Sequence, residues 1–152
     1  MRQPWAWAIA MLDGNPDAKN VENRSAGFPS AYRGPLLVHA AKEAWAGQLD
    51  PASTSHAALL TLATRVPFED LRSVVLAVVE LADVHPDTGC CRPWGESAYT
   101  GADRAQHRGV VHLVLEDVRP LAEPIPCRGA LGLWRPPAEV EMAVFEQLGA
   151  TT

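Results

Sequence analysis

The sequence predicts a single α+β domain whose centre is a small curved or closed β-sheet. Four or five segments have the composition of strands, and few of them are joined by tight hairpin signals. Helical patterns lie at both ends of the chain, and a pair of helical patterns lies between two of the strand segments. A chain of 152 residues, 47% hydrophobic and 20% charged, suits one folded core. We therefore treat residues 1–152 as one domain.

The N-terminal half is expected to contain a short helix, two strands and a helical pair. Alanine favours helices over strands, so the Ala- and Trp-rich run after Pro4 is interpreted as a buried helix. A continuous apolar run indicates a buried strand, and polar capping residues before residue 56 indicate a helix start. The expected elements are a helix over 5–12, strands over 20–24 and 36–40, and helices over 41–49 and 56–65.

The C-terminal half carries the clearest strand patterns. Residues 73–84 are almost all apolar and rich in valine, which predicts a strand covered on both faces. A long aperiodic segment follows over 85–106, then a strand over 109–119 and short extended pieces over 120–137, where prolines and glycines interrupt the chain. A last helix over 138–148 should turn Val140, Val144, Phe145 and Leu148 to the core.

Charge and cysteine content exclude several classes of protein. A net charge of −5 disfavours broad binding to long nucleic acid, but no carboxylate lies between Arg24 and Lys42, which leaves room for a small cationic site. Three cysteines, Cys90, Cys91 and Cys127, do not form a disulfide framework and should be reduced. With no apolar run of membrane length and no signal-peptide layout, we expect a cytoplasmic protein without a membrane partner.

Lys19, Glu22 and Arg24 form the most informative cluster of charges. In a strand Glu22 and Arg24 point to one face, and the long side chain of Lys19 can bring its ammonium to the same side. Two cationic donors and one carboxylate acceptor could hold a phosphate and bind a base edge. The alternative is that Glu22 and Arg24 only neutralise each other within the sheet.

Around this cluster the chain resembles a known family. The similarity lies in Gln3-Pro4-Trp5-Ala6, Gly14, Lys19-x-x-Glu22-x-Arg24 and Tyr32-Arg33-Gly34-x-Leu36-Leu37-x-His39-Ala40, with later matches at Leu81-Ala82-Asp83-Val84 and Gly129-x-x-Gly132-Leu133-Trp134. In these residues the sequence is similar to the ASCH domain family of the PUA-like superfamily. The resemblance covers nearly the whole chain.

This resemblance implies a PUA-like β-barrel of about five to six strands, flanked by helices, with Lys19, Glu22 and Arg24 on the floor of a cleft. ASCH domains are regarded as modules that bind RNA or nucleotides. Some small bacterial members are amidohydrolases that act on N4-acetylcytidine, and others are described as ribonucleases. The amidohydrolases have a hydroxyl residue where this chain has Glu22, so their nucleophile does not transfer directly.

Aromatic and charged residues near the cluster complete the expected site. Stacking on a base is the role considered for Trp5, Tyr32, Trp94 and Tyr99. The residues expected to bind a nucleotide are Trp5, Lys19, Glu22, Arg24, Tyr32, Arg33 and Trp94. Glu80, inside an apolar strand, could be a general base near Lys19 or could lie in water at the rim of the sheet.

A metal site and a cofactor are not expected. Cys90 and Cys91, with His85, His107 and Cys127, contain zinc-binding residue types, but adjacent cysteines lack the spacer of two to four residues that is usual in zinc sites. His39 and His112 fall in apolar strands and are expected to be hydrogen-bonded core residues.

Three functions follow as hypotheses. The leading one is binding of RNA or a modified nucleotide in a cationic cleft. The second is hydrolysis of an acylated cytidine or of RNA, with Lys19 and Glu22 or Glu80 as acid and base. The third is an adaptor whose acidic C-terminal helix binds a protein, for which the sequence indicates no particular partner.

Overall fold

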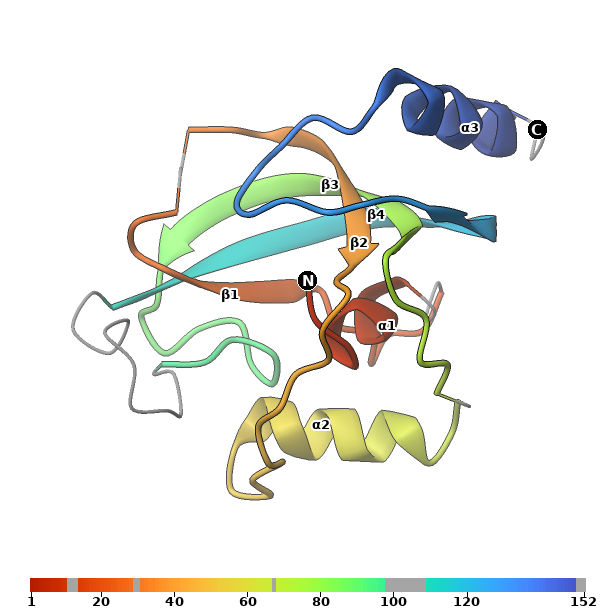
Figure 1. Ribbon diagram of the computed structural model, residues 1–152. Coiled ribbons are helices and arrows are strands. Elements are labelled where there is room, and N and C mark those ends of the chain that lie inside the picture. The colour runs from red at the N-terminus through yellow and green to blue at the C-terminus, as the bar shows by residue number, and fades with distance from the viewer. Residues whose placement is uncertain (11–13, 29–30, 67, 98–108, 150–152) are drawn as a thin grey trace.

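The computed structural model describes residues 1–10, 14–28, 31–66, 68–97 and 109–149. It is an α+β fold (Figure 1). Its elements in chain order are α1 (Trp5–Ala10), β1 (Val21–Ser25), β2 (Gly34–Ala40), α2 (Thr54–Ala63), β3 (Val74–Pro86), β4 (Val110–Pro126) and α3 (Ala138–Gly149). Among the described residues, no helix is both long and apolar enough to cross a membrane.

The four strands form one antiparallel sheet in the order β1-β4-β3-β2. The central strands β3 and β4 have 13 and 17 residues, and their register shifts at three places. Such irregularities increase the bend and twist of a strand pair, and Figure 1 shows both ribbons curving along their length.

In the part of the chain that the structure describes, the sheet has four strands and is open, so the expected closed barrel of five to six strands is wrong. β1 pairs with the first residues of β4, from Val110 to Val114, which lie beside the last residues of β3. β2 pairs instead with the first part of β3, from Val74 to Leu81. The two outer strands therefore flank different ends of the central pair and do not pair with each other.

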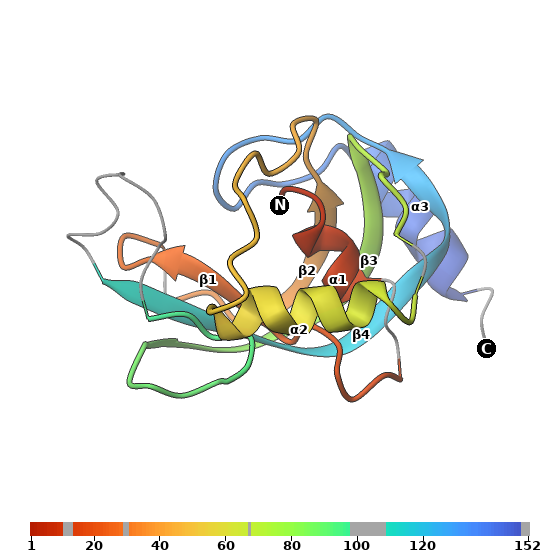
Figure 2. The same ribbon diagram turned by 90° about the horizontal axis from the view of Figure 1, so that it is seen from below.

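Helices cover both faces of the sheet. Figure 1 places α3 above the sheet and α2 below it, and the view from below in Figure 2 shows α2 in front. Ile9 of α1 packs with Val38, Leu76 and Leu113 in the main core. Two further clusters of buried side chains lie near α2 and under α3. The first contains Trp7, Leu59, Leu62 and Trp94, and the second contains Val75, Val78, Leu121, Val140 and Val144.

Two predicted segments differ from the structure. The helix expected over 41–49 is absent, because the backbone N–H of Ala41 donates to Met1 and that of Trp45 donates to Gln3. Residues 120–126 continue β4 rather than forming short pieces. Their prolines are tolerated because β1 ends its pairing at Val114, which leaves that edge of β4 open, where a missing N–H costs little.

The C-terminal helix α3 lies where it was predicted, but fewer of its residues are buried than the sequence pattern predicts. Val140 and Val144 are each 5% exposed, whereas Phe145 is 73% exposed and does not face the core. Leu148 is partly buried against the same cluster. The other predicted elements agree with the structure to within a few residues, except that residues 11 and 12 of the first helix lie outside the described residues.

Candidate functional site

Lys19 is a buried cation in the segment just before β1. It is 2% exposed, and its backbone N–H donates to the carbonyl of Ala8. Its ammonium donates to the carbonyl of Val21 and lies 3.3 Å from Oε2 of Glu22. The ring centroids of Trp5 and Trp94 lie 5.9 and 5.8 Å from Nζ, within the range of a cation–π contact. The structure thus places two of the expected aromatic residues beside the expected lysine.

Glu22 joins Lys19 to Arg24. Its other oxygen, Oε1, lies 3.1 Å from Nη2 of Arg24, so one carboxylate bridges two cations. The side chain of Glu22 is 12% exposed and that of Arg24 is 43% exposed. The cluster therefore has a buried cationic end at Lys19 and a water-facing cationic end at Arg24.

Burial and neighbouring charges shift the pKa values of Glu22 and Lys19, the two members of the buried ion pair. Burial acts to raise the pKa of Glu22, but Lys19 and Arg24 together outweigh it and hold that pKa below its ordinary value. Burial lowers the pKa of Lys19, and the attraction of Glu22 only partly opposes this. Glu22 is consequently a carboxylate that stays ionised and keeps a fixed orientation.

Glu96 is a second carboxylate near Lys19. No periodic pattern pointed to it, because it lies in an aperiodic loop. The hydroxyls of Ser53, the N-cap residue of α2, and of Ser55, in its first turn, both donate to Oε1 of Glu96. Its backbone N–H donates to Oδ1 of Asn23, 2.9 Å away. Glu96 contributes to the electrostatics of Lys19, whereas the predicted partner Glu80 does not.

These side chains border a large groove of about 2640 Å³. Small-molecule pockets are typically about 300–1,000 Å³, so this is an extended surface rather than a closed pocket. Seven of its described lining residues are Lys or Arg and four are Glu, although the whole chain has a net charge of −5. The arginines that the sequence reasoning missed, Arg119, Arg128 and Arg135, come from β4 and the loop that follows it.

The remaining predicted site residues differ in their position relative to the groove. Tyr32 lines the groove, is 40% exposed and donates its hydroxyl to the carbonyl of Pro35. Arg33 pairs with Asp83, with 2.9 Å between Nη2 and Oδ1. Glu80 lies near Gly34 on the neighbouring strand β2. Tyr99 lies outside the described residues.

The cysteines and histidines that have zinc-binding side chains do not all lie in one group. His85, Cys90 and Cys91 are neighbours, and His112 joins them. Cys127 is distant from this group and its carbonyl bonds to the ring of His39, while His107 lies outside the described residues. As predicted, His39 and His112 are buried and hydrogen-bonded.

The two adjacent thiols have different acidities. Hydrogen bonding from Thr88, whose hydroxyl lies 3.4 Å from the sulfur, is the largest of the effects that lower the pKa of Cys90 to about 6. Burial raises the pKa of Cys91. Cys90 is therefore mainly a thiolate at neutral pH, the form that binds metals and reacts with electrophiles.

Fold and site together define an α+β protein with an open antiparallel sheet and a cationic groove. No family model matches the chain, and no curated protein matches it. The resemblance to ASCH domains therefore depends on the motif residues themselves and stays a prediction.

Proposed function

We propose that this protein binds single-stranded RNA or a modified nucleotide in the groove, as an ASCH-type domain of the PUA-like superfamily whose sheet is open between β1 and β2. The observation that carries the proposal is the excess of cations along the groove of an otherwise acidic chain. Lysine and arginine neutralise phosphates, and such contacts supply most of the affinity of proteins for a nucleic-acid backbone.

Each member of the charged cluster has a separate role in this proposal. Arg24, the exposed cation, contacts a phosphate or a base carbonyl. Glu22 accepts a hydrogen bond from the exocyclic amino group of a base, because it stays ionised. Lys19 orients Glu22 and does not meet the ligand, since its ammonium is already enclosed by Val21, Glu22 and two tryptophan rings.

The aromatic residues beside the groove supply stacking surfaces. Trp5 and Tyr32 both line it, and base stacking on such a ring is worth roughly 1 to 3 kcal/mol per base. Trp94 is only 2% exposed, so in this proposal it packs against the ammonium of Lys19 and does not stack on a base. The three free cysteines suit a reducing location such as the cytoplasm, where RNA and nucleotides are found.

Binding of labelled single-stranded RNA, measured by fluorescence anisotropy at several salt concentrations, tests the proposal. Arg24→Gln should lower the slope of log K against log salt by about 0.7, the value for one phosphate contact on a single strand. Arg72→Gln is the matched control, because Arg72 is 42% exposed and also pairs with a carboxylate. If neither RNA nor N4-acetylcytidine binds, or if both variants weaken RNA binding equally, the proposal is wrong.

A second candidate function is amide hydrolysis, which the Ser55–Glu96 contact favours. Ser55 and Glu96 both line the groove, and the hydroxyl donates to the carboxylate. On an N-acylated cytidine, Oγ of Ser55 would attack the carbonyl while Glu96 takes its proton, and the departing amine would receive that proton. Water would then release the acyl group. Product analysis with N4-acetylcytidine, with Ser55→Ala as the comparison, separates this activity from binding alone.

A further inference from the structure

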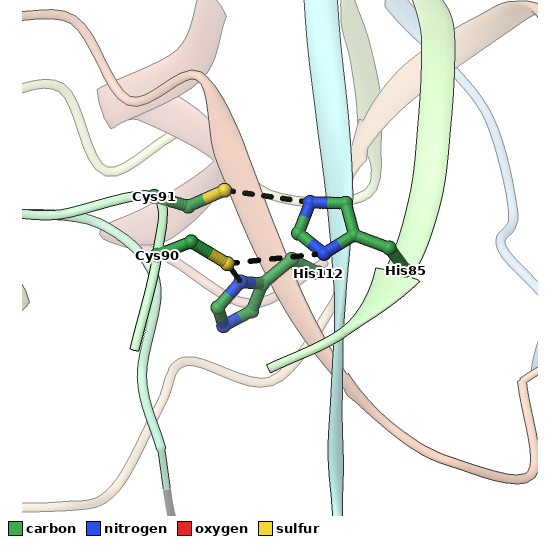
Figure 3. A group of neighbouring side chains, drawn as sticks. All are labelled: His85, Cys90, Cys91 and His112. Atoms are coloured by element: carbon green, nitrogen blue, oxygen red, sulfur yellow. Dashed lines mark hydrogen bonds between the residues drawn. The ribbon is translucent and has the colours of Figure 1, made fainter. Parts of the chain in front are cut away.

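We propose that His85, Cys90, Cys91 and His112 form a Zn²⁺ site with two thiolate and two imidazole ligands. The ligand atoms of all four residues lie within 4.8 Å of one another. Cys90 and Cys91 lie in the segment that follows β3. In Figure 3 both sulfur atoms point from this segment toward the two imidazole rings, which project from β3 and β4. This inference is independent of the proposed nucleotide function.

The distances between sulfur and nitrogen fit a tetrahedral zinc ion. With Zn–S of about 2.3 Å and Zn–N of about 2.0–2.1 Å, tetrahedral geometry requires S···N distances of about 3.5 Å. Sγ of Cys91 lies 3.5 Å from Nε2 of His85, and Sγ of Cys90 lies 3.6 Å from Nδ1 of His112. These two pairs already have the spacing of zinc ligands, and the remaining pairs, all within 4.8 Å, would close around one ion.

The other nitrogen of each imidazole already has a hydrogen-bond acceptor. Nε2 of His112 lies 3.0 Å from the carbonyl of Glu96 and 3.5 Å from a carboxylate oxygen of Asp87. Nδ1 of His85 lies 3.0 Å from the carbonyl of Pro86. Donation to these oxygens leaves the unprotonated nitrogen of each ring facing a sulfur. Zinc-binding histidines typically show this arrangement, in which the outer partner fixes the tautomer and orientation of the ring.

The backbone explains how two adjacent cysteines can serve one ion. Cys91 has a φ of +62°, a left-handed conformation that non-glycine residues adopt at a cost. This turn replaces the missing spacer between the cysteines, so that both thiols lie on the same side of the loop. On the sheet, His85 pairs directly with His112, which fixes the separation of the two rings.

The loop that carries Cys90, Cys91 and Gly95 also packs closely against the proposed zinc ligands. A Cβ on Gly95 would lie 2.7 Å from Cε1 of His112 and 2.8 Å from the carbonyl oxygen of Cys90. Four protein ligands leave no position for a substrate, so the site is structural rather than catalytic. Zinc would join the loop of Cys90 and Cys91 to both central strands.

The decisive measurement is metal binding by the full chain after reduction and chelation. Zn²⁺ is titrated against a chromogenic competing chelator, and Co²⁺ is added separately to follow its visible spectrum. We expect about one equivalent of zinc, and a Co²⁺ spectrum with intense tetrahedral bands and a thiolate charge-transfer band. Cys90→Ser and His85→Gln should each weaken zinc affinity more than about 100-fold, beyond the usual effect of losing an outer-shell partner.

Cys127→Ser is the matched control, since Cys127 is a free cysteine outside the group, and it should retain one equivalent. His85 is only partly buried, so His85→Gln remains informative if Cys90→Ser fails to fold. The proposal is overturned if the reduced wild-type chain takes up no zinc, if Co²⁺ gives only weak octahedral bands, or if both variants keep wild-type affinity. Formation of a Cys90–Cys91 disulfide under the reducing conditions, with no zinc uptake, also overturns it.

Discussion

Replacing Glu22 by glutamine should destabilise the protein more than replacing its buried partner. Glu22→Gln keeps the shape of the side chain but leaves the ammonium of Lys19, whose side chain is 3% exposed, without its anion. Two unit charges 3.3 Å apart attract each other by roughly 5 kcal/mol at an effective dielectric constant of about 20. Since Glu96, the Val21 carbonyl and the two tryptophan rings still stabilise Lys19, we expect a net loss of about 3 kcal/mol.

Lys19→Met is the informative comparison because it removes the buried charge together with its desolvation cost. Glu22 then retains Arg24 and some contact with water, so the expected loss is only about 1 to 2 kcal/mol. Urea unfolding of the wild type and both variants, followed by circular dichroism, gives the two free-energy differences. A Glu22→Gln loss below about 1 kcal/mol, or equal losses in both variants, would refute a buried, charge-paired Lys19.

The pH dependence provides an independent check on the same cluster. The pKa of Glu22 is lower in the folded protein than its ordinary value of 4.5. A carboxylate with a depressed pKa stabilises the fold above its unfolded pKa, and this contribution is lost as pH falls through the folded value. The stability difference between wild type and Glu22→Gln should therefore be constant near neutral pH and shrink below pH 4.5. A difference that instead grows on acidification would contradict the assigned charges.

Three further predictions concern the loop, the metal and the last helix. Gly95→Ala should cost about 1 to 3 kcal/mol by overpacking against the His112 ring and should weaken zinc binding, as measured by urea unfolding and metal titration. With zinc at about 1,000 times its Kd, chelation should remove about 4 kcal/mol and lower Tm by about 8–16 °C in a thermal melt. Val144→Ala should cost about 1 to 3 kcal/mol and Phe145→Ala less than about 0.5, because only Val144 is buried; equal costs would contradict the assigned face.

The charged cluster was predictable because the contacts that define it are local. Lys19, Glu22 and Arg24 lie within six residues, and the alternation of a strand brings the last two to one face. The helix expected over 41–49 does not form, because this segment makes its backbone hydrogen bonds with residues that are distant in the sequence. Its alanine content is compatible with a helix, but the backbone N–H groups of Ala41 and Trp45 donate to Met1 and Gln3, which lie 40 and 42 residues earlier, and no local pattern encodes such contacts.

The cysteine and histidine group could be predicted only in part. Its sequence signal, two adjacent cysteines near His85, lacked the usual spacer. The spacer is replaced by the φ of +62° at Cys91, and residue identity does not specify this conformation. The fourth member, His112, comes from the antiparallel register of β3 and β4, where it lies opposite His85. Glu96 and the groove arginines were missed because their positions likewise depend on tertiary contacts.

One segment, residues 87–97, connects the proposed zinc site to the proposed groove. Cys90 and Cys91 hold its first part to the histidines, while Trp94 and Glu96 lie beside Lys19. Asn23 fixes the second part, because its side chain donates to the Trp94 carbonyl and accepts from the Glu96 amide. Asn23 follows Glu22 in β1 and points to the opposite face of the sheet. If both proposals hold, zinc immobilises the loop that encloses Lys19, and the orientation of Glu22 in the groove depends on a metal bound on the other face.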